Sequence, residues 1–170
     1  MKKLLLLSIV IFVSGCTHLY KMHSYKDVEV ELEAGLLAVS YSSGRWVKIS
    51  KDPEITELSE PFTFRVVLLT DGLEGEKVRI NVHEISGVAK GWSTYDLNVD
   101  EFTEPTYYKG RKEKSVGVAG LIKGVTSGYS EFSITFEVIY GDKSEMKTIK
   151  MLPVHWEERR NNWFDGIMSV

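Results

Sequence analysis

The sequence predicts an all-β fold, an antiparallel sandwich of about seven to nine short strands. Several segments alternate apolar and polar residues with a period of two, which places the apolar side chains on one face of a strand. Clusters of Gly, Pro, Asp and Ser separate these segments, as expected for turns. No long stretch carries the period of an amphipathic helix. A small barrel is the second architecture that this pattern allows.

The first strands are expected soon after residue 26. Residues 28–32 alternate apolar with acidic side chains, which is typical of a half-buried strand. Residues 36–41 are mostly apolar and predict a more buried strand. We expect residues 42–44, Ser-Ser-Gly, to end that strand, and residues 45–50 to form another short one.

The middle of the chain contains the clearest strand. A loop is expected over residues 52–61, which have a proline near each end, and the strand follows over residues 62–70. After a turn at residues 71–75, residues 77–85 alternate again, so we expect these two strands to form a hairpin. A further strand is expected over residues 92–99. The inward residues of the second hairpin strand would be Val78, Ile80 and Val82.

The last third of the chain begins with a weak signal. Residues 101–128 contain four closely spaced glycines near their end, which predicts a long loop with at most one broken edge strand. Residues 132–140 and 146–152 predict a second hairpin around a turn at 141–144. A short helix is expected within residues 155–170. Together the elements favour a single immunoglobulin-like sandwich domain over residues 27–170.

The N-terminus has the features of an export signal. Lys2 and Lys3 precede residues 4–13, which are apolar except for Ser8. Ten residues are too short to span a bilayer, which needs about 20 as a helix, but they match the apolar core of a signal peptide. We therefore interpret residues 1–15 as a signal peptide.

Ser14, Gly15 and Cys16 follow this apolar segment, and the stretch resembles the lipobox of bacterial lipoproteins. Val13 departs from the leucine that is commoner there. The resemblance implies that Cys16 receives diacylglycerol on its sulfur, becomes the new N-terminus and is acylated on its amine. The alternative is an ordinary signal peptide, or an uncleaved anchor, with an incidental cysteine.

The resemblance also implies a location in the cell envelope. Two or three acyl chains hold a domain firmly on a membrane, so the membrane is the first expected partner. Thr17 stands where aspartate would favour retention at the inner membrane, so the expected site is the outer membrane, facing the periplasm. We interpret residues 16–26 as the lipidated cysteine and a tether, with His18 and His23 in solvent.

Composition excludes several function classes. The chain has 24 acidic and 21 basic side chains, and loss of Lys2 and Lys3 with the signal leaves 19 basic side chains and a charge of −5. No nucleic acid partner is expected, because such binding needs a concentrated basic surface. Because Cys16 is the only cysteine, the cysteine count excludes an intramolecular disulfide, and it argues against a thiolate zinc site and a cysteine nucleophile.

One motif opens like a calcium loop. Asp96, Asn98 and Asp100 form D-x-N-x-D, but Glu101 and Tyr107 occupy the positions where an EF-hand needs glycine and glutamate. A strand with a polar outer face is the favoured interpretation. We therefore predict no calcium site here.

A zinc site is the second possibility that we weighed. His83-Glu84 could converge with His155, Glu157 and Glu158 if their strands were neighbours. However, His83 follows the inward Val82 and is expected to face solvent.

The sequence also lacks the motifs of two common catalytic sites, namely a phosphate-loop frame and a G-x-S-x-G elbow. We predict no metal site, no cofactor, no catalytic residues and no enzymatic activity.

The four tryptophans allow two interpretations. Core filling is favoured over exposure for each of them, because large aromatics are mostly buried. The expected function is therefore a lipid-anchored envelope lipoprotein with a structural or protein-interaction role, using residues 101–128 and the tail. The alternative is a module that binds a glycan or another small periplasmic ligand through exposed aromatics. The tryptophans are Trp46, Trp92, Trp156 and Trp163.

Overall fold

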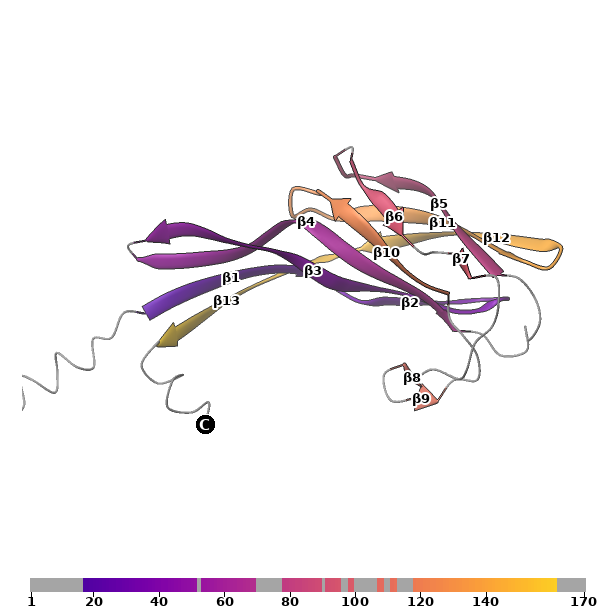
Figure 1. The fold of residues 1–170 in the computed structure, drawn as a ribbon, viewed down its shortest axis with the longest axis horizontal. Helices are drawn as coiled ribbons and strands as arrows, with labels where there is room; N and C mark the ends of the chain where they lie inside the picture. The colour runs from indigo at the N-terminus through magenta and orange to yellow at the C-terminus, as the bar shows by residue number, and fades with distance from the viewer. Residues whose placement is uncertain are drawn as a thin grey trace, which may run out of the picture. The chain divides into compact units, whose positions relative to one another are not determined.

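The structure is a computed structural model (Figure 1). It describes residues 17–51, 53–69, 78–89, 91–95, 98–99, 107–108, 111–112 and 118–161. The expected signal peptide, Cys16, the turn at 71–75, Asp96, Asp100 and Trp163 lie outside the described residues. Within the described residues, no helix is long and apolar enough to span a lipid bilayer.

The described residues divide into two compact units. The small unit contains residues 17–23, 45–59 and 155–161, and the sandwich unit contains the described residues of 24–44 and 60–154. Strands β1 (Thr17–Tyr25), β3 (Gly35–Lys51), β4 (Glu54–Leu69) and β13 (Pro153–Asn161) contribute residues to both units.

The sandwich unit consists of two main sheets. The first has the order β2-β3-β4-β10-β6 and the second has the order β12-β11-β5-β7. A separate two-stranded sheet pairs β8 with β9. The strands that lie wholly within the sandwich unit are β2 (Val28–Leu32), β5 (Val78–Ser86), β6 (Ser93–Tyr95), β7 (Asn98–Val99), β8 (Tyr107–Tyr108), β9 (Arg111–Lys112), β10 (Val118–Val125), β11 (Phe132–Tyr140) and β12 (Lys143–Met151).

The core of this unit lies between the two main sheets. Strand β11 alternates strictly between buried and half-buried residues, whereas β4 alternates from Phe62 to Val66 and is then buried through Leu69. Each such burial stabilises the fold by about 1.5–3 kcal/mol. The predicted all-β, immunoglobulin-like sandwich is confirmed, since two antiparallel sheets enclose one core. The inward residues are Phe62, Phe64, Val66 and Leu68 of β4 and Phe132, Ile134, Phe136 and Val138 of β11.

The second predicted hairpin is confirmed. Strands β11 and β12 pair from Phe132 with Met151 to Tyr140 with Lys143, which leaves Gly141 and Asp142 as the turn. The first predicted hairpin is wrong. Strand β4 lies in the first sheet, whereas β5 pairs with β11 and β7 in the second. Strand β5 therefore pairs with β11, which is distant in the sequence, and not with β4, which precedes it in the chain.

The inward face predicted for β5 is partly confirmed. Val78 and Ile80 are buried, but Val82 is only partly buried. Thr135 pairs with Glu84 while Phe136 pairs with Val82, so a β-bulge interrupts the alternation at this point.

Two predicted breaks lie inside continuous strands. Strand β3 runs through residues 42–44, and β4 begins at Glu54 and runs through Pro61, where the sequence predicts a loop. Pro61 lies between residues 55–58, which pair with β1, and residues 62–68, which pair with β10. Its missing N–H therefore removes no hydrogen bond from the pairings with β1 and β10.

The predicted glycine-rich loop is wrong over residues 118–125. These residues form β10, which lies between β4 and β6 and buries Ile122 and Val125 completely. The register shifts between those two residues, and Gly124 there has a φ of +78°. Glycine at this position permits a bulge within a strand, because a residue with a Cβ rarely adopts this φ.

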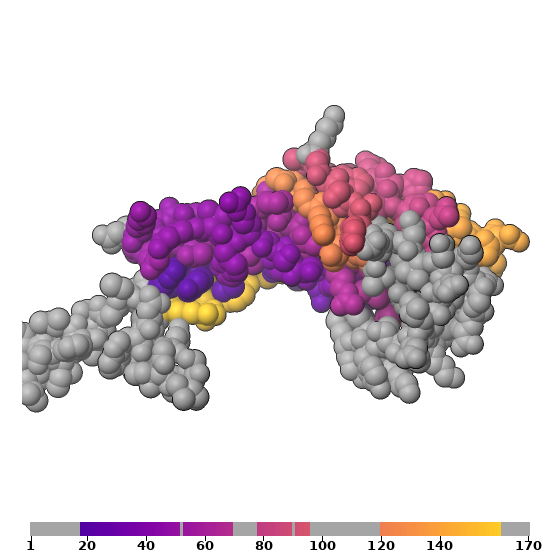
Figure 2. Space-filling view, in the orientation of Figure 1, coloured from indigo at the N-terminus to yellow at the C-terminus, as the bar shows by residue number. Residues whose placement is uncertain are grey.

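Two segments that the sequence assigns to a tether and a helix are strands. Residues 17–25 form β1, which pairs in parallel with β4. Residues 153–161 form β13, which neighbours β1 at the edge of the sheet. Figure 2 shows yellow β13 against indigo β1. These two strands, with the adjoining ends of β3 and β4, make up the small unit.

Candidate functional site

The sheet of the small unit has two faces of different chemistry. Leu19 pairs with Ile55 and Tyr20 with Thr56, so alternate residues of β1 and β4 share a face. We name the two faces by their residues. The aromatic face carries His18, Tyr20, Trp46, Lys48, Glu54, Thr56, Trp156, Glu158 and Arg160. The histidine face carries Lys21, His23, Glu57, His155 and Glu157.

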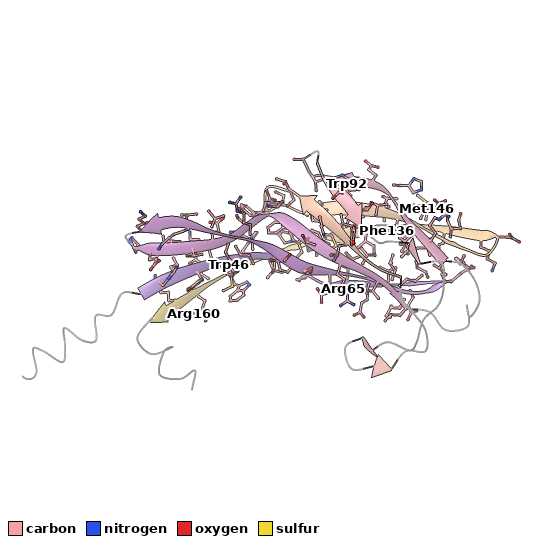
Figure 3. The ribbon with its side chains drawn as sticks, in the orientation of Figure 1. Trp46, Arg65, Trp92, Phe136, Met146 and Arg160 are labelled. Carbon is pink, nitrogen blue, oxygen red and sulfur yellow. The ribbon has the colours of Figure 1, made fainter. Side chains whose placement is uncertain are left out.

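Three rings on the aromatic face contact one another in series, and an arginine contacts the middle ring. The ring of His18 stacks on Tyr20, with centroids 4.2 Å apart, and Tyr20 meets Trp46 edge to face at 5.8 Å. The guanidinium of Arg160 lies 5.1 Å from the centre of the Tyr20 ring, within the range of a cation–π interaction. Figure 3 labels Trp46 on β3 and Arg160 on β13.

A charged cluster fixes one end of this series. His18 is 9 % exposed, and its Nε2 lies 2.7 Å from the Thr56 hydroxyl and its Nδ1 lies 3.5 Å from a Glu54 carboxylate oxygen. Lys48 forms an ion pair with the same Glu54 carboxylate. The hydrogen bond from Lys48 contributes most to lowering the pKa of Glu54, while burial opposes it. Glu54 is therefore a stable carboxylate that orients the His18 ring.

Trp156 also belongs to the aromatic face. On β13, His155 contacts His23 on one face of the sheet and Arg160 contacts Tyr20 on the other. Because strand residues alternate, Trp156 shares the face of Arg160. Trp46 is 50 % and Trp156 is 48 % exposed. The core-filling interpretation is therefore wrong for both, whereas Trp92 packs partly buried against the core.

The histidine face brings two imidazoles into direct contact. Nδ1 of His23 lies 2.6 Å from Nδ1 of His155, and the ring planes meet at 71°. On the other side of the His23 ring, Nε2 lies 3.4 Å from a Glu57 carboxylate oxygen. Lys21 and Glu157 form an ion pair of 3.7 Å on the same face.

The zinc arrangement that we weighed from the sequence does not form. His155 meets His23, while His83 lies 3.0 Å from Glu137 in the sandwich unit, exposed to solvent as expected. Glu158 binds Arg160. Within the described part of the chain, no three His, Cys, Asp or Glu side chains are placed to hold a metal ion together.

A polar network in the sandwich unit is the third cluster. One carboxylate oxygen of Glu60 accepts hydrogen bonds from the Ser127 amide at 2.5 Å, the Ser127 hydroxyl at 3.0 Å and the Tyr129 amide at 3.4 Å. The hydroxyl of Tyr25 contacts Ser127 and donates to the Ser130 carbonyl at 2.9 Å. Ser127 donates to a carboxylate and not to an imidazole base, so this cluster stabilises a turn and lacks the form of an activated nucleophile.

The sequence interpretation missed the residues of the small unit. His18, Tyr20 and Met22 alternate with Leu19, Lys21 and His23, but the two buried side chains of this segment are the histidine and the methionine, while Leu19 is half-buried. This period of two was the available signal, and the polarity of the segment concealed it.

The described residues define an all-β protein with an immunoglobulin-like sandwich. No family model matches the chain, and no curated protein matches it. A search of solved structures finds the crystal structure of the GAE domain of yeast GGA1, at 9 % identity and a TM-score of 0.31. The match covers 76 % of this chain and 100 % of that domain. A TM-score of this size supports no conclusion about partners.

Proposed function

We propose that this protein is a lipid-anchored lipoprotein of a bacterial envelope, held on the periplasmic side of the outer membrane, where it binds another envelope protein. The anchor is inferred from the signal-like N-terminus and from Ser14, Gly15 and Cys16. The interaction role is inferred from the aromatic face of the small unit.

The exposed tryptophans are the observation that carries the interaction role. Trp46 and Trp156 each leave about half of their surface in water on one face of a sheet. Tyr20 lies beside Trp46, and Arg160 lies over the Tyr20 ring. Trp, Tyr and Arg are the residues that contribute most to protein–protein binding energy. Such a group favours a protein interface over an ordinary solvated strand.

The interface is tested by recovering the partner from solubilised envelope. The double variant Trp46→Ala, Trp156→Ala is compared with Met146→Ala, which removes an exposed side chain from β12. After crosslinking and quantitative mass spectrometry, we expect an envelope protein to be reduced at least about tenfold with the double variant only. Equal recovery with both variants, or recovery of no partner from wild type, contradicts the interface.

The anchor and its location have separate tests. We expect Cys16→Ser to leave an unlipidated precursor that no longer partitions into the detergent phase. We expect Thr17→Asp to move the lipidated protein to inner-membrane fractions in a density gradient. Normal partitioning of Cys16→Ser, or an unmodified thiol on the mature N-terminus by mass spectrometry, contradicts the anchor.

A second candidate function uses the same face. Aromatic rings on a sheet can stack on sugars, so a glycan is the alternative ligand. Adding soluble envelope saccharide fragments then quenches or shifts the fluorescence of exposed Trp46, and Trp46→Ala removes the response. The absence of any such response in wild type excludes this candidate. The expectation that the protein has no enzymatic activity stays a prediction.

A further inference from the structure

The contact between His23 and His155 needs a chemical explanation. Their Nδ1 atoms lie 2.6 Å apart, within hydrogen-bond distance, so either one nitrogen donates a hydrogen to the other or both direct lone pairs at a shared cation. The residues are 132 positions apart and come from neighbouring strands β1 and β13. Their convergence is therefore a property of the fold and not of local sequence.

We propose that His23 and His155 bind one divalent transition-metal ion through their Nδ1 atoms, with Cu²⁺ preferred to Zn²⁺. Imidazole nitrogen is a good ligand for both ions, and Cu²⁺ has the highest affinity for such donors among the divalent first-row ions. This inference is independent of the proposed anchor and interface.

Glu57 prepares His23 for this role. Its carboxylate oxygen lies 3.4 Å from Nε2, on the side of the ring away from His155. A hydrogen on Nε2 is attracted to this carboxylate, which leaves the lone pair on Nδ1 directed toward His155. A carboxylate behind the ligating histidine is the usual arrangement in metal sites, where it fixes the tautomer and raises ligand basicity.

The spacing of the two nitrogens favours a tetragonal ion. Bonds of about 2.0–2.1 Å place two nitrogens about 3.3 Å apart around tetrahedral zinc, and about 2.9 Å apart in neighbouring positions around square-planar copper. The observed 2.6 Å is a hydrogen-bond distance shorter than both spacings, and the copper spacing requires the smaller separation of the two nitrogens.

The site has open coordination positions. No third His, Cys, Asp or Glu of the described ranges joins the pair in a common metal-holding group. Water or a donor from a bound molecule therefore completes the coordination. Such a site differs from a closed structural metal site, in which the protein supplies all four ligands.

The test uses the mature, full-length protein in detergent, freed of metal with a chelator. Cu²⁺ is titrated calorimetrically in the presence of glycine, which removes weak surface binding, and bound Cu²⁺ is examined by electron paramagnetic resonance. We expect one Cu²⁺ per chain with a two-nitrogen hyperfine pattern. His155→Ala, and separately His23→Ala, are expected to weaken binding by more than tenfold, and Glu57→Gln by about tenfold.

The matched control is His83→Ala. His83 is also an exposed histidine beside a carboxylate, but its contact is Glu137 and not a second histidine. We expect this variant to bind Cu²⁺ as wild type does. Since His155 is exposed, His155→Ala retains the fold and decides the outcome even if His23→Ala does not fold. Unchanged affinity in His155→Ala, or equal loss in His83→Ala, overturns the proposal.

Discussion

Tyr25 donates a hydrogen bond of 2.9 Å to the carbonyl of Ser130, which lies 105 residues further along the chain. The ring of Tyr25 also meets Phe132 edge to face at 5.0 Å, so one side chain connects β1 to the start of β11 through both its polar and its apolar parts. The hydroxyl is buried, which makes its hydrogen bond costly to remove.

Tyr25→Phe is expected to destabilise the protein by about 1–2 kcal/mol, because the ring contacts remain while the Ser130 carbonyl loses its donor. Tyr41→Phe is the matched control. The Tyr41 hydroxyl is buried without a hydrogen-bond partner among the described residues, so its removal is expected to be neutral or stabilising by up to about 1 kcal/mol. Urea unfolding measures both. Equal destabilisation by the two substitutions contradicts this account of the network.

The same two tyrosines predict a loss of stability in alkali. Burial raises the pKa of Tyr25 and of Tyr41 above the ordinary value of 10.0. A raised folded-state pKa contributes stability that is complete below the unfolded pKa and is lost as pH rises through the folded one. We expect the urea midpoint to fall above about pH 10, and to fall less in the double variant Tyr25→Phe, Tyr41→Phe. An identical pH profile for the double variant and wild type is the contrary result.

The lowered pKa of Glu137 predicts that stability also falls in acid. Hydrogen bonds from His83, first, and Asn81 lower the pKa of Glu137 below its ordinary value of 4.5. The stability that the Glu137 carboxylate contributes to the folded state is present above pH 4.5, and it is lost as pH falls through the lower folded-state pKa. Thermal melts from pH 6 to pH 3 are expected to show a shallower decline for Glu137→Gln than for wild type. A steeper or equal decline in that variant contradicts the prediction.

The bulge in β10 can be tested with a pair of glycines. Gly124 has a φ of +78°, and a Cβ there would lie 3.0 Å from the Gly91 carbonyl oxygen. Gly128 has a φ of +64° with nothing within 4 Å of its added Cβ. We expect Gly128→Ala to cost about 1 kcal/mol and Gly124→Ala about 2–3 kcal/mol, because only the second adds a backbone clash. Chemical denaturation measures the difference, which vanishes if the close approach to Gly91 is absent.

The sequence predicts those elements whose information is local. The β11–β12 hairpin is correct because the alternation from Phe132 to Tyr140 and the turn at Gly141 are adjacent in the chain. The β4–β5 hairpin is wrong because β5 finds its partner in β11, whose residues begin some 46 positions after β5 ends. Alternation shows that a strand exists and which face is buried, but it does not identify the partner strand.

The candidate sites were less accessible to sequence reasoning. His23 and His155 meet only because β1 and β13 are neighbours, which no local pattern encodes. Tryptophan is usually a core residue, so its type predicts burial of Trp46. Its exposure follows from the face of the sheet on which it lies, which the sequence does not show. Expectations about Cys16 concern residues that the structure does not describe, and they stay predictions.

The small unit is assembled from residues 17–23, 45–59 and 155–161. It therefore cannot form until residues 155–161 have been synthesised, whereas most sandwich pairings are available earlier. Forming contacts across so many residues is slow because the loop-closure entropy is lost before any contact compensates for it. The histidine pair and the aromatic face would thus be acquired last, after the strands of the sandwich unit are available.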